Sequence, residues 1–134
     1  MPVAVDTNIV VRFLTHDDEP QYQQACTVFQ SPQVYISNTV FLETEWVLRY
    51  AYDYQPSDII RALTMLLGLP NVEAEEPGRM AIALQWHHVG LDFADALHLA
   101  SSQHCDKLYT FDSDFVKKGN ALSTCIVKKP EEEK

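Results

Sequence analysis

The chain has 134 residues, a length typical of one domain that buries its own core without disulfides or metals. Hydrophobic residues make up 46% and charged residues 22%, an ordinary globular composition with no apolar run as long as the roughly 20 residues of a membrane helix. The three cysteines lack CxxC spacing, so we expect reduced, buried thiols. Together with the lack of a secretory pattern, these features favour a cytoplasmic protein that does not contact membranes.

The formal charge of −9, from ten basic and nineteen acidic residues, counts against a broad basic surface for nucleic acid. Acids gathered around divalent cations would be neutralised by the metal, which changes the local field. The spacing of Cys and His residues matches no zinc motif. Nucleic-acid binding therefore stays open chiefly through an acidic metal site.

Strands and helices alternate along the chain. Short strands are expected at 3–5, 34–36, 108–110 and 125–127, and helices at 20–29, 38–52, 56–67, 77–88 and 92–104. This alternation predicts an α/β fold, a three-layer α/β/α sandwich with a central, mostly parallel sheet. We expect one domain over residues 1–129, a loop around Glu73, Glu75 and Glu76, and a disordered acidic tail at 130–134.

Acidic side chains follow two of the expected strands. Asp6 comes directly after the first strand, and Asp112 and Asp114 follow the strand in KLYTFDSDF. Because ligands of parallel α/β sheets bind at the carboxyl ends of the strands, these acids are candidates for one shared site. Turns and helix caps explain Asp112 and Asp114 equally well. Short polar side chains that would orient these acids or waters are Thr7, Asn8 and Thr110.

Glu43 has mostly apolar neighbours at helical spacing, including Trp46 and Tyr50. This pattern predicts a buried carboxylate without a basic partner on its own helix, and such a group must be protonated, hydrogen-bonded or bound to a cation. Glu45 differs because Arg49, four residues later, offers an ordinary ion pair. Glu43 is therefore the candidate functional acid of this helix.

Asp95, in GLDFADALHLA, has two explanations that the sequence leaves open. It either contributes to the acidic site or favours the positive end of a helix capped by Asp92. His98, one turn later, either contacts the same site or is partly buried and hydrogen-bonded. The basic side chains nearest these acids, which we expect to be solvated unless they contact a phosphate backbone, are Arg12, Arg49, Lys117 and Lys118.

Four segments, each containing one of these acids, occur in the order VDTNIVVRFL, ISNTVFLETEWVLR, DFADALHLASSQ and LYTFDSDF. Together they resemble the PIN domain family, and more narrowly the VapC-like toxin ribonucleases of bacterial toxin–antitoxin pairs. The resemblance covers nearly the whole chain. It implies a homodimer, inhibition by a small antitoxin protein, and one acidic pocket formed by Asp6, Glu43, Asp95 and Asp112, with Asp114 as a further metal ligand.

The implied activity is hydrolysis of RNA phosphodiester bonds, with transfer RNA among the expected substrates. Mg²⁺ or Mn²⁺ is the implied cofactor, since both ions prefer oxygen ligands and can activate water. Two alternatives stay open: a PIN-fold binding module that has lost its metal site, and a receiver-like phospho-acceptor domain. The second alternative requires adjacent acids after the first strand, whereas Asp6 stands alone there.

Overall fold

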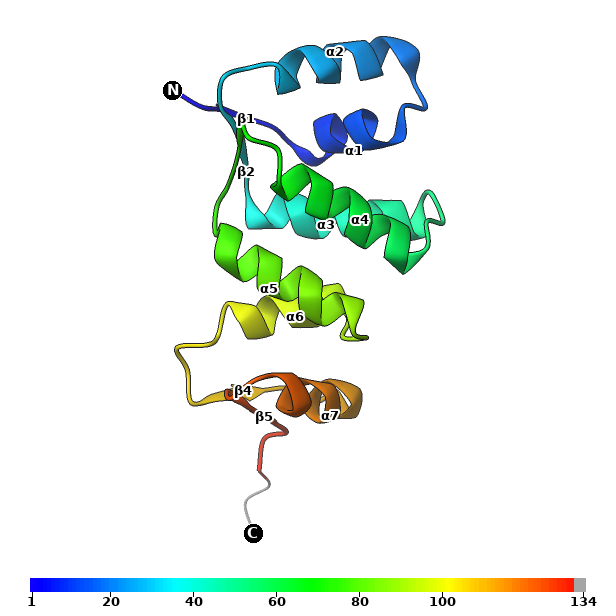
Figure 1. Cartoon of the computed structure of the whole chain (residues 1–134). Helices are drawn as coiled ribbons and strands as arrows, with labels where there is room; N and C mark the ends of the chain where they lie inside the picture. The colour runs from blue at the N-terminus through cyan, green and yellow to red at the C-terminus, as the bar shows by residue number, and fades with distance from the viewer. Residues whose placement is uncertain (132–134) are drawn as a thin grey trace. The chain divides into compact units, whose positions relative to one another are not determined.

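The computed structural model describes residues 1–131. The chain folds as two compact units, Met1–Pro77 and Gly78–Lys134, and each has its own parallel sheet (Figure 1). The single domain expected over residues 1–129 stays a prediction, and residues 132–134 of the expected tail lie outside the described part. Among the described helices, none combines the length and apolar character needed to cross a bilayer.

The first unit has a three-stranded sheet of order β1-β2-β3, with all pairings parallel. Its elements are β1 (Val3–Ala4), α1 (Thr7–Thr15), α2 (Glu19–Phe29), β2 (Val34–Ile36), α3 (Asn38–Tyr50), α4 (Pro56–Leu67) and β3 (Val72–Ala74). The central strand β2 is the most buried of the three, and Val34 and Ile36 are fully buried. Helix α1 packs against α2 and α3 around the buried residues Val10 and Val11.

Helix starts in the first unit follow from local chemistry. The side chains of Asp6, Asp18 and Ser37 each accept a hydrogen bond from a backbone N–H in the first turn of the helix that follows. Such caps satisfy donors that have no partner within the helix, and each is worth about 1 kcal/mol. Helix α4 instead begins with Pro56, whose missing N–H costs nothing at that position.

The second unit contains α5 (Pro77–His88), α6 (Phe93–Ala100), β4 (Lys107–Tyr109), α7 (Ser113–Leu122) and β5 (Ile126–Lys128). Strands β4 and β5 pair in parallel, with Leu108 opposite Val127. Helix α7 packs closely on β5. The core of this unit includes Phe93, Leu99 and Phe115.

Several element predictions are confirmed, and others are corrected. Strand β2 and helix α4 have the predicted bounds. Strand β3 was expected to be a loop because of its glutamates, but its three residues pair with β2. Helix α1 was missed as a helix, although Asp6 caps it, and the helix expected over 92–104 ends at Ala100.

Burial differs within the first strand segment and among the cysteines. Val3 of β1, the edge strand of its three-stranded sheet, is 40% exposed, whereas Val5, directly after the strand, is buried. The cysteines are free thiols, as predicted, but only Cys125 is buried, while Cys105 is exposed. Cys105 follows the end of α6 in a turn, where no element covers it.

Candidate active site

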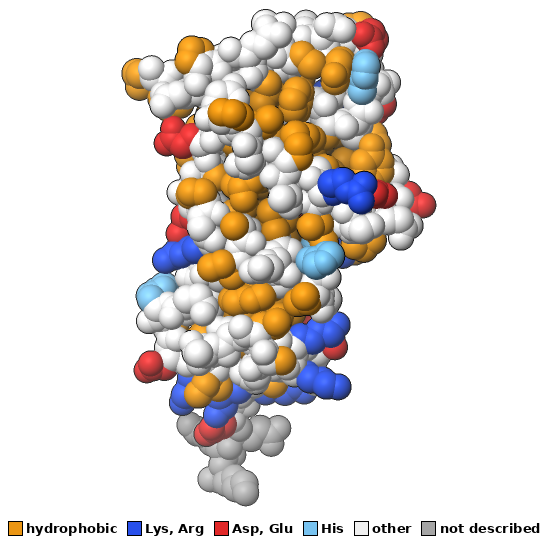
Figure 2. All heavy atoms as spheres, in the orientation of Figure 1, with side chains coloured by type: hydrophobic (Ala, Val, Ile, Leu, Met, Phe, Trp, Pro, Cys, Tyr) orange, Lys and Arg blue, Asp and Glu red, His pale blue; other side chains and the backbone are white. Residues whose placement is uncertain are grey.

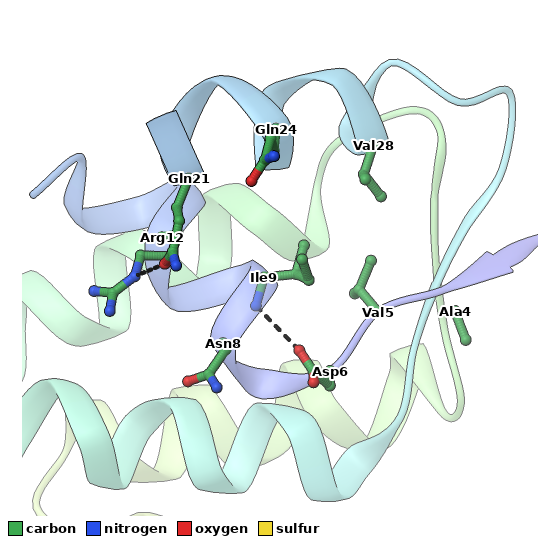
Figure 3. Close-up of a pocket in the computed structure, with 9 residues that line it drawn as sticks. All are labelled: Ala4, Val5, Asp6, Asn8, Ile9, Arg12, Gln21, Gln24 and Val28. Carbon is green, nitrogen blue, oxygen red and sulfur yellow. Dashed lines mark hydrogen bonds between the residues drawn. The ribbon is translucent and has the colours of Figure 1, made fainter. Parts of the chain in front are cut away.

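Asp6 lies where β1 passes into α1, and it caps that helix. Its Oδ1 accepts a hydrogen bond from the backbone N–H of Ile9 at 3.2 Å (Figure 3). Within residues 1–131, no hydrogen bond to the other carboxylate oxygen is present, and the side chain is exposed. The cap therefore orients the carboxylate and leaves one oxygen available for a ligand. This explains why an acid stands between two apolar segments.

A hollow of about 660 Å³ adjoins Asp6 in the first unit. Asn8, Arg12, Gln21 and Gln24 contribute its polar lining (Figure 3). Thr7 and Asn8 form the first turn of α1, so the three polar residues that end the strand all lie at the N-terminus of one helix. Backbone N–H groups and the helix dipole favour negative charge at this position.

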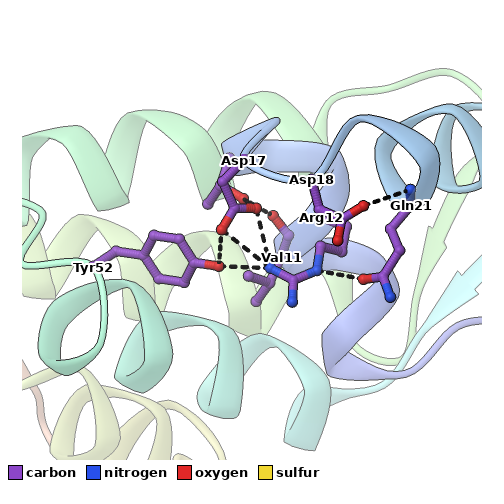
Figure 4. Close-up of polar contacts among 7 residues, drawn as sticks. Val11, Arg12, Asp17, Asp18, Gln21 and Tyr52 are labelled. Atoms are coloured by element: carbon purple, nitrogen blue, oxygen red, sulfur yellow. Dashed lines mark hydrogen bonds and ion pairs between the residues drawn. The ribbon is translucent and has the colours of Figure 1, made fainter.

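Arg12 was considered for RNA binding, but in the structure its guanidinium forms hydrogen bonds with other side chains of the protein (Figure 4). Nη1 donates to both carboxylate oxygens of Asp17, at 3.0 and 3.1 Å, and to the Tyr52 hydroxyl at 2.8 Å. Nε donates to Gln21 at 2.6 Å, and the Tyr52 hydroxyl donates to Asp17 at 2.7 Å. These contacts tie α1 to α2 and to the turn after α3. Their geometry indicates a structural role for Arg12.

Glu43 was expected to be buried, and this prediction is wrong: the side chain is exposed on α3. Its aromatic neighbours are also exposed, Trp46 by 57% and Tyr50 by 62%, and they pack on each other. The core-facing residues of α3 are Phe41, Thr44, Glu45 and Leu48, which follow the three-and-four spacing of an amphipathic helix. Trp46 and Tyr50 therefore do not face the core, although Val40, three residues before Glu43, is buried.

Glu45 is the buried acid of α3, with only 1% of its side chain exposed. Arg49 pairs with it through two contacts, Nε to Oε2 at 3.0 Å and Nη2 to Oε1 at 3.1 Å. The predicted ion pair is present, but it joins a buried carboxylate to a half-buried guanidinium, and of the two contacts the one from Nη2 has hydrogen-bond geometry. The guanidinium of Arg49 also lies over the Tyr50 ring, 4.7 Å from its centroid. Arg49 is therefore engaged within the protein, although it was considered for RNA binding.

Asp112 caps α7 in the second unit. Its Oδ1 accepts hydrogen bonds from the backbone N–H groups of Asp114 at 2.9 Å and Phe115 at 3.2 Å. Thr110 Oγ1 in turn accepts a hydrogen bond from the Asp112 backbone N–H at 3.1 Å, which fixes the turn before α7. The turn-and-cap explanation left open for Asp112 is thus present in the structure. It fixes one oxygen of an exposed carboxylate, as the Asp6 cap does.

Asp95 lies in the first turn of α6, and its backbone N–H donates to the capping carboxylate of Asp92 at 3.2 Å. Partial burial raises the pKa of Asp95, and the nearby negative charges of Asp92 and Asp112 raise it further. His98 has a smaller opposing effect, and it is exposed rather than partly buried. The structure thus brings Asp95 and Asp112 near each other. Asp92, predicted only as a cap, adds to the same negative field.

Asp114 also raises the pKa of Asp95, by a smaller effect, which places it in the same group of carboxylates. Its Oδ2 pairs with Lys118 at 3.0 Å across one turn of α7, and Lys118 also donates to the Gly90 carbonyl at 3.1 Å. Both members of this pair are well exposed. Lys117 is exposed on the same helix.

The donor chemistry of the second unit suits a hard divalent cation, because all of these groups are carboxylates whose mutual repulsion a cation would relieve. Among residues 1–131, however, no three His, Cys, Asp or Glu side chains are arranged as a ready-made metal site. Asp6 and Glu43 belong to the first unit, and Asp95, Asp112 and Asp114 to the second. A common pocket for all of these acids stays a prediction.

The PIN domain family model matches residues 3–121 of this chain. The chain therefore belongs to the PIN domain family, which confirms the predicted α/β/α fold class with a parallel sheet. No curated protein matches it. Among solved structures, it is similar to Mycobacterium tuberculosis VapC20, a toxin that cleaves the sarcin–ricin loop. The two share 22% sequence identity over 87% of this chain and 95% of that one, with a TM-score of 0.44, so the family assignment rests on the family model.

Proposed function

We propose that this chain is a metal-dependent endoribonuclease that acts as the toxin of a toxin–antitoxin pair. Membership of the PIN family supports a nuclease rather than a receiver-like domain. The observation that carries the proposal is the cluster of carboxylates in the second unit, where desolvation and neighbouring acids raise the pKa of Asp95. An acid with a raised pKa beside other carboxylates is more typical of a functional site than of a solvated surface.

Asp6, Glu43, Asp95 and Asp112 are the proposed ligands of Mg²⁺ or Mn²⁺, with Asp114 as a further ligand. When bound, such an ion supplies an activated water and positive charge for the phosphodiester. The caps on α1 and α7 hold Asp6 and Asp112 each by one oxygen, so the other oxygen is oriented without the cost of ordering a free side chain. Asp114 already pairs with Lys118 through Oδ2, and this ion pair offsets part of its negative charge, which makes it the weakest member of the set.

The partners of this proposal follow from the family resemblance. RNA is the substrate, with transfer RNA among the candidates, and a small antitoxin protein is the inhibitor. We place the protein in the cytoplasm as a homodimer. Light scattering of the purified protein measures self-association, and the same measurement after addition of a candidate antitoxin protein measures the inhibited complex.

The test compares caps that have the same structure but different proposed roles. Asp6→Asn and Asp112→Asn keep an oxygen that accepts the capping bonds, since Asn caps helices as well as Asp does. Asp18→Asn is the matched control, because Asp18 caps α2 through a 3.0 Å bond from the Gln21 N–H and is not a proposed ligand. RNA cleavage is measured with Mn²⁺, with Mg²⁺ and with chelator.

We expect each site variant to lose at least about 100-fold in cleavage rate, which corresponds to about 3 kcal/mol of transition-state stabilisation. Asp18→Asn should cleave at the rate of the unmodified protein, and chelator should abolish cleavage. Wild-type cleavage by Asp6→Asn would refute the site. RNA binding without cleavage under any metal condition would support the silent binding module instead.

A further inference from the structure

Phe111 is the most exposed aromatic side chain described, with 83% of its surface accessible. It lies between Thr110 and Asp112, directly beside a proposed metal ligand. Tyr109, at the end of β4, is also exposed, by 56%. Large apolar side chains are normally buried in a small domain, so two exposed rings at one strand end indicate a binding surface.

The backbone around Phe111 is fixed on both sides. The Thr110 N–H donates to the Lys128 carbonyl at 3.0 Å, and the Asp112 N–H donates to Thr110 Oγ1 at 3.1 Å. Asp112 then anchors the start of α7 through its two capping bonds. The Phe111 ring is therefore displayed from an ordered turn, which reduces the conformational entropy lost when a ligand contacts it.

A hollow of about 400 Å³ lies next to this turn in the second unit. Tyr109 and Thr110 line it together with Asp95 and His98. An aromatic ring, a hydroxyl, a carboxylate and an imidazole thus face one space. This combination suits a nucleobase, which offers a flat face for stacking and polar edges for hydrogen bonds.

The charge distribution also favours the second unit as the RNA contact. Residues 1–77 carry three basic and eleven acidic side chains, a formal charge of −8, whereas residues 78–131 carry six of each and are neutral. Figure 2 shows Lys and Arg side chains gathered over the part that holds β4, β5 and α7. Two of these lysines are already paired, Lys118 with Asp114 and Lys128 with Glu131.

A surface with so few available cations gains limited affinity from phosphate contacts. We propose that Phe111, assisted by Tyr109, is a stacking platform for an unpaired base of single-stranded RNA beside the scissile phosphate. Stacking on an aromatic ring is tolerant of base identity, and it requires a base that is free of a duplex. This inference rests on the proposed function, and it specifies the substrate as unpaired RNA.

The experiment measures RNA binding and RNA cleavage separately. Binding of labelled oligoadenylate and oligouridylate is followed by fluorescence anisotropy in an Asp6→Asn background, so that substrate is not consumed. A second probe carries 2-aminopurine, whose fluorescence falls when it stacks. The variants are Phe111→Ala, Phe111→Leu and Phe111→Trp, and Ile126→Ala is the control because Ile126 is an apolar side chain of the same unit with 50% exposure.

We expect Phe111→Ala to raise the Kd for single-stranded RNA by roughly 5- to 150-fold, the range found for loss of one stacked base. Phe111→Leu should behave like Phe111→Ala, Phe111→Trp should bind like the unmodified protein, and Ile126→Ala should have no effect. In the cleavage assay Phe111→Ala should raise KM more than it lowers kcat. Urea unfolding should be unchanged, since the side chain makes little contact with the core.

The two proposals fail in different ways. RNA binding that depends on Phe111 in a protein that cleaves no RNA would support the platform and refute the nuclease. Unchanged Kd, KM and 2-aminopurine quenching in Phe111→Ala, in a protein that cleaves RNA, would refute the platform alone. Loss of self-association or of antitoxin binding, with RNA affinity unchanged, would make Phe111 a protein contact and also refute the platform.

Discussion

Gly119 lies in the interior of α7, where alanine is normally preferred. Replacing glycine by alanine in a helix interior adds about 1 kcal/mol of stability in the absence of other contacts. Here a Cβ at position 119 would lie 2.8 Å from Cγ2 of Val127 on β5 and 3.3 Å from two ring atoms of Phe115. Carbon atoms in contact are normally separated by about 3.5–4.0 Å, so the neighbours would have to move.

Val127 has little freedom to move. Its side chain is fully buried, and the Asn120 amide holds its backbone by two hydrogen bonds, at 2.7 Å to the carbonyl and 2.8 Å from the N–H. The branched side chain is also stiff at its first torsion angle. Overpacking of this kind costs about 1–3 kcal/mol, which exceeds the helix-propensity gain. We therefore expect Gly119→Ala to lower the free energy of unfolding by about 1 kcal/mol.

Urea unfolding followed by far-UV circular dichroism measures this change, and a double-mutant cycle assigns it. In a Val127→Ala background the obstructing methyl group is gone, so Gly119→Ala should now stabilise the protein, by up to about 1 kcal/mol. Stabilisation by Gly119→Ala in the unmodified background would refute the close packing of α7 on β5. An equal loss in both backgrounds would show that Val127 is not the obstructing residue.

Further predictions concern the polar networks of the first unit. Tyr52→Phe removes the hydroxyl that contacts both Arg12 and Asp17, and it should lower the free energy of unfolding by about 1 kcal/mol in urea titrations. The hydrogen bond from the Tyr52 hydroxyl is the main cause that lowers the pKa of Asp17. Asp17 therefore stabilises the fold above its unfolded-state pKa, and this stabilisation is lost as the pH falls through its folded-state pKa. Stability measured against pH should therefore fall less steeply on the acid side in Asp17→Asn. Arg49→Met leaves the buried Glu45 carboxylate without this partner and should cost about 2–3 kcal/mol, whereas Glu45→Gln combined with Arg49→Met should recover part of that loss.

Two of the proposed ligands, Asp6 and Asp112, have a structural explanation that is complete without any function. Each caps a helix that follows a parallel strand. The two roles are compatible because a carboxylate has two oxygens, and a cap uses one. For this reason loss of stability in an alanine variant says nothing about catalysis at these positions, and the asparagine variants are the informative ones.

Helix positions and helix caps were largely predictable because they depend on residues close together in the chain. Asp92, Pro56 and the start of α3 were recognisable from propensity and capping alone. Strand β3 was not, since its residues have no strand pattern and become a strand only by pairing with β2. Long-range pairing of this kind overrides local preference.

Burial was the least predictable property of the candidate site. The helical spacing around Glu43 indicated a buried face, but two apolar stripes were available on α3, and the one with Phe41 and Leu48 faces the core. Glu45 was expected to form only an ordinary ion pair with Arg49, and the burial of its carboxylate was not foreseen. Which stripe of a helix packs inward depends on the elements around it, and these are distant in sequence.

The amino-acid sequence by itself determines the local properties of this protein. These are the order of the acids, the strand ends that carry them and the turns that cap the following helices. Only the tertiary structure decided which acids interact electrostatically. Desolvation raises the pKa of Asp95, and the negative charges of Asp92 and of Asp112, which is distant in sequence, raise it further. The tertiary structure also decided that Phe111 is displayed while Glu45 is buried. The physical reason is that exposure and electrostatic coupling depend on distances in space, which packing sets.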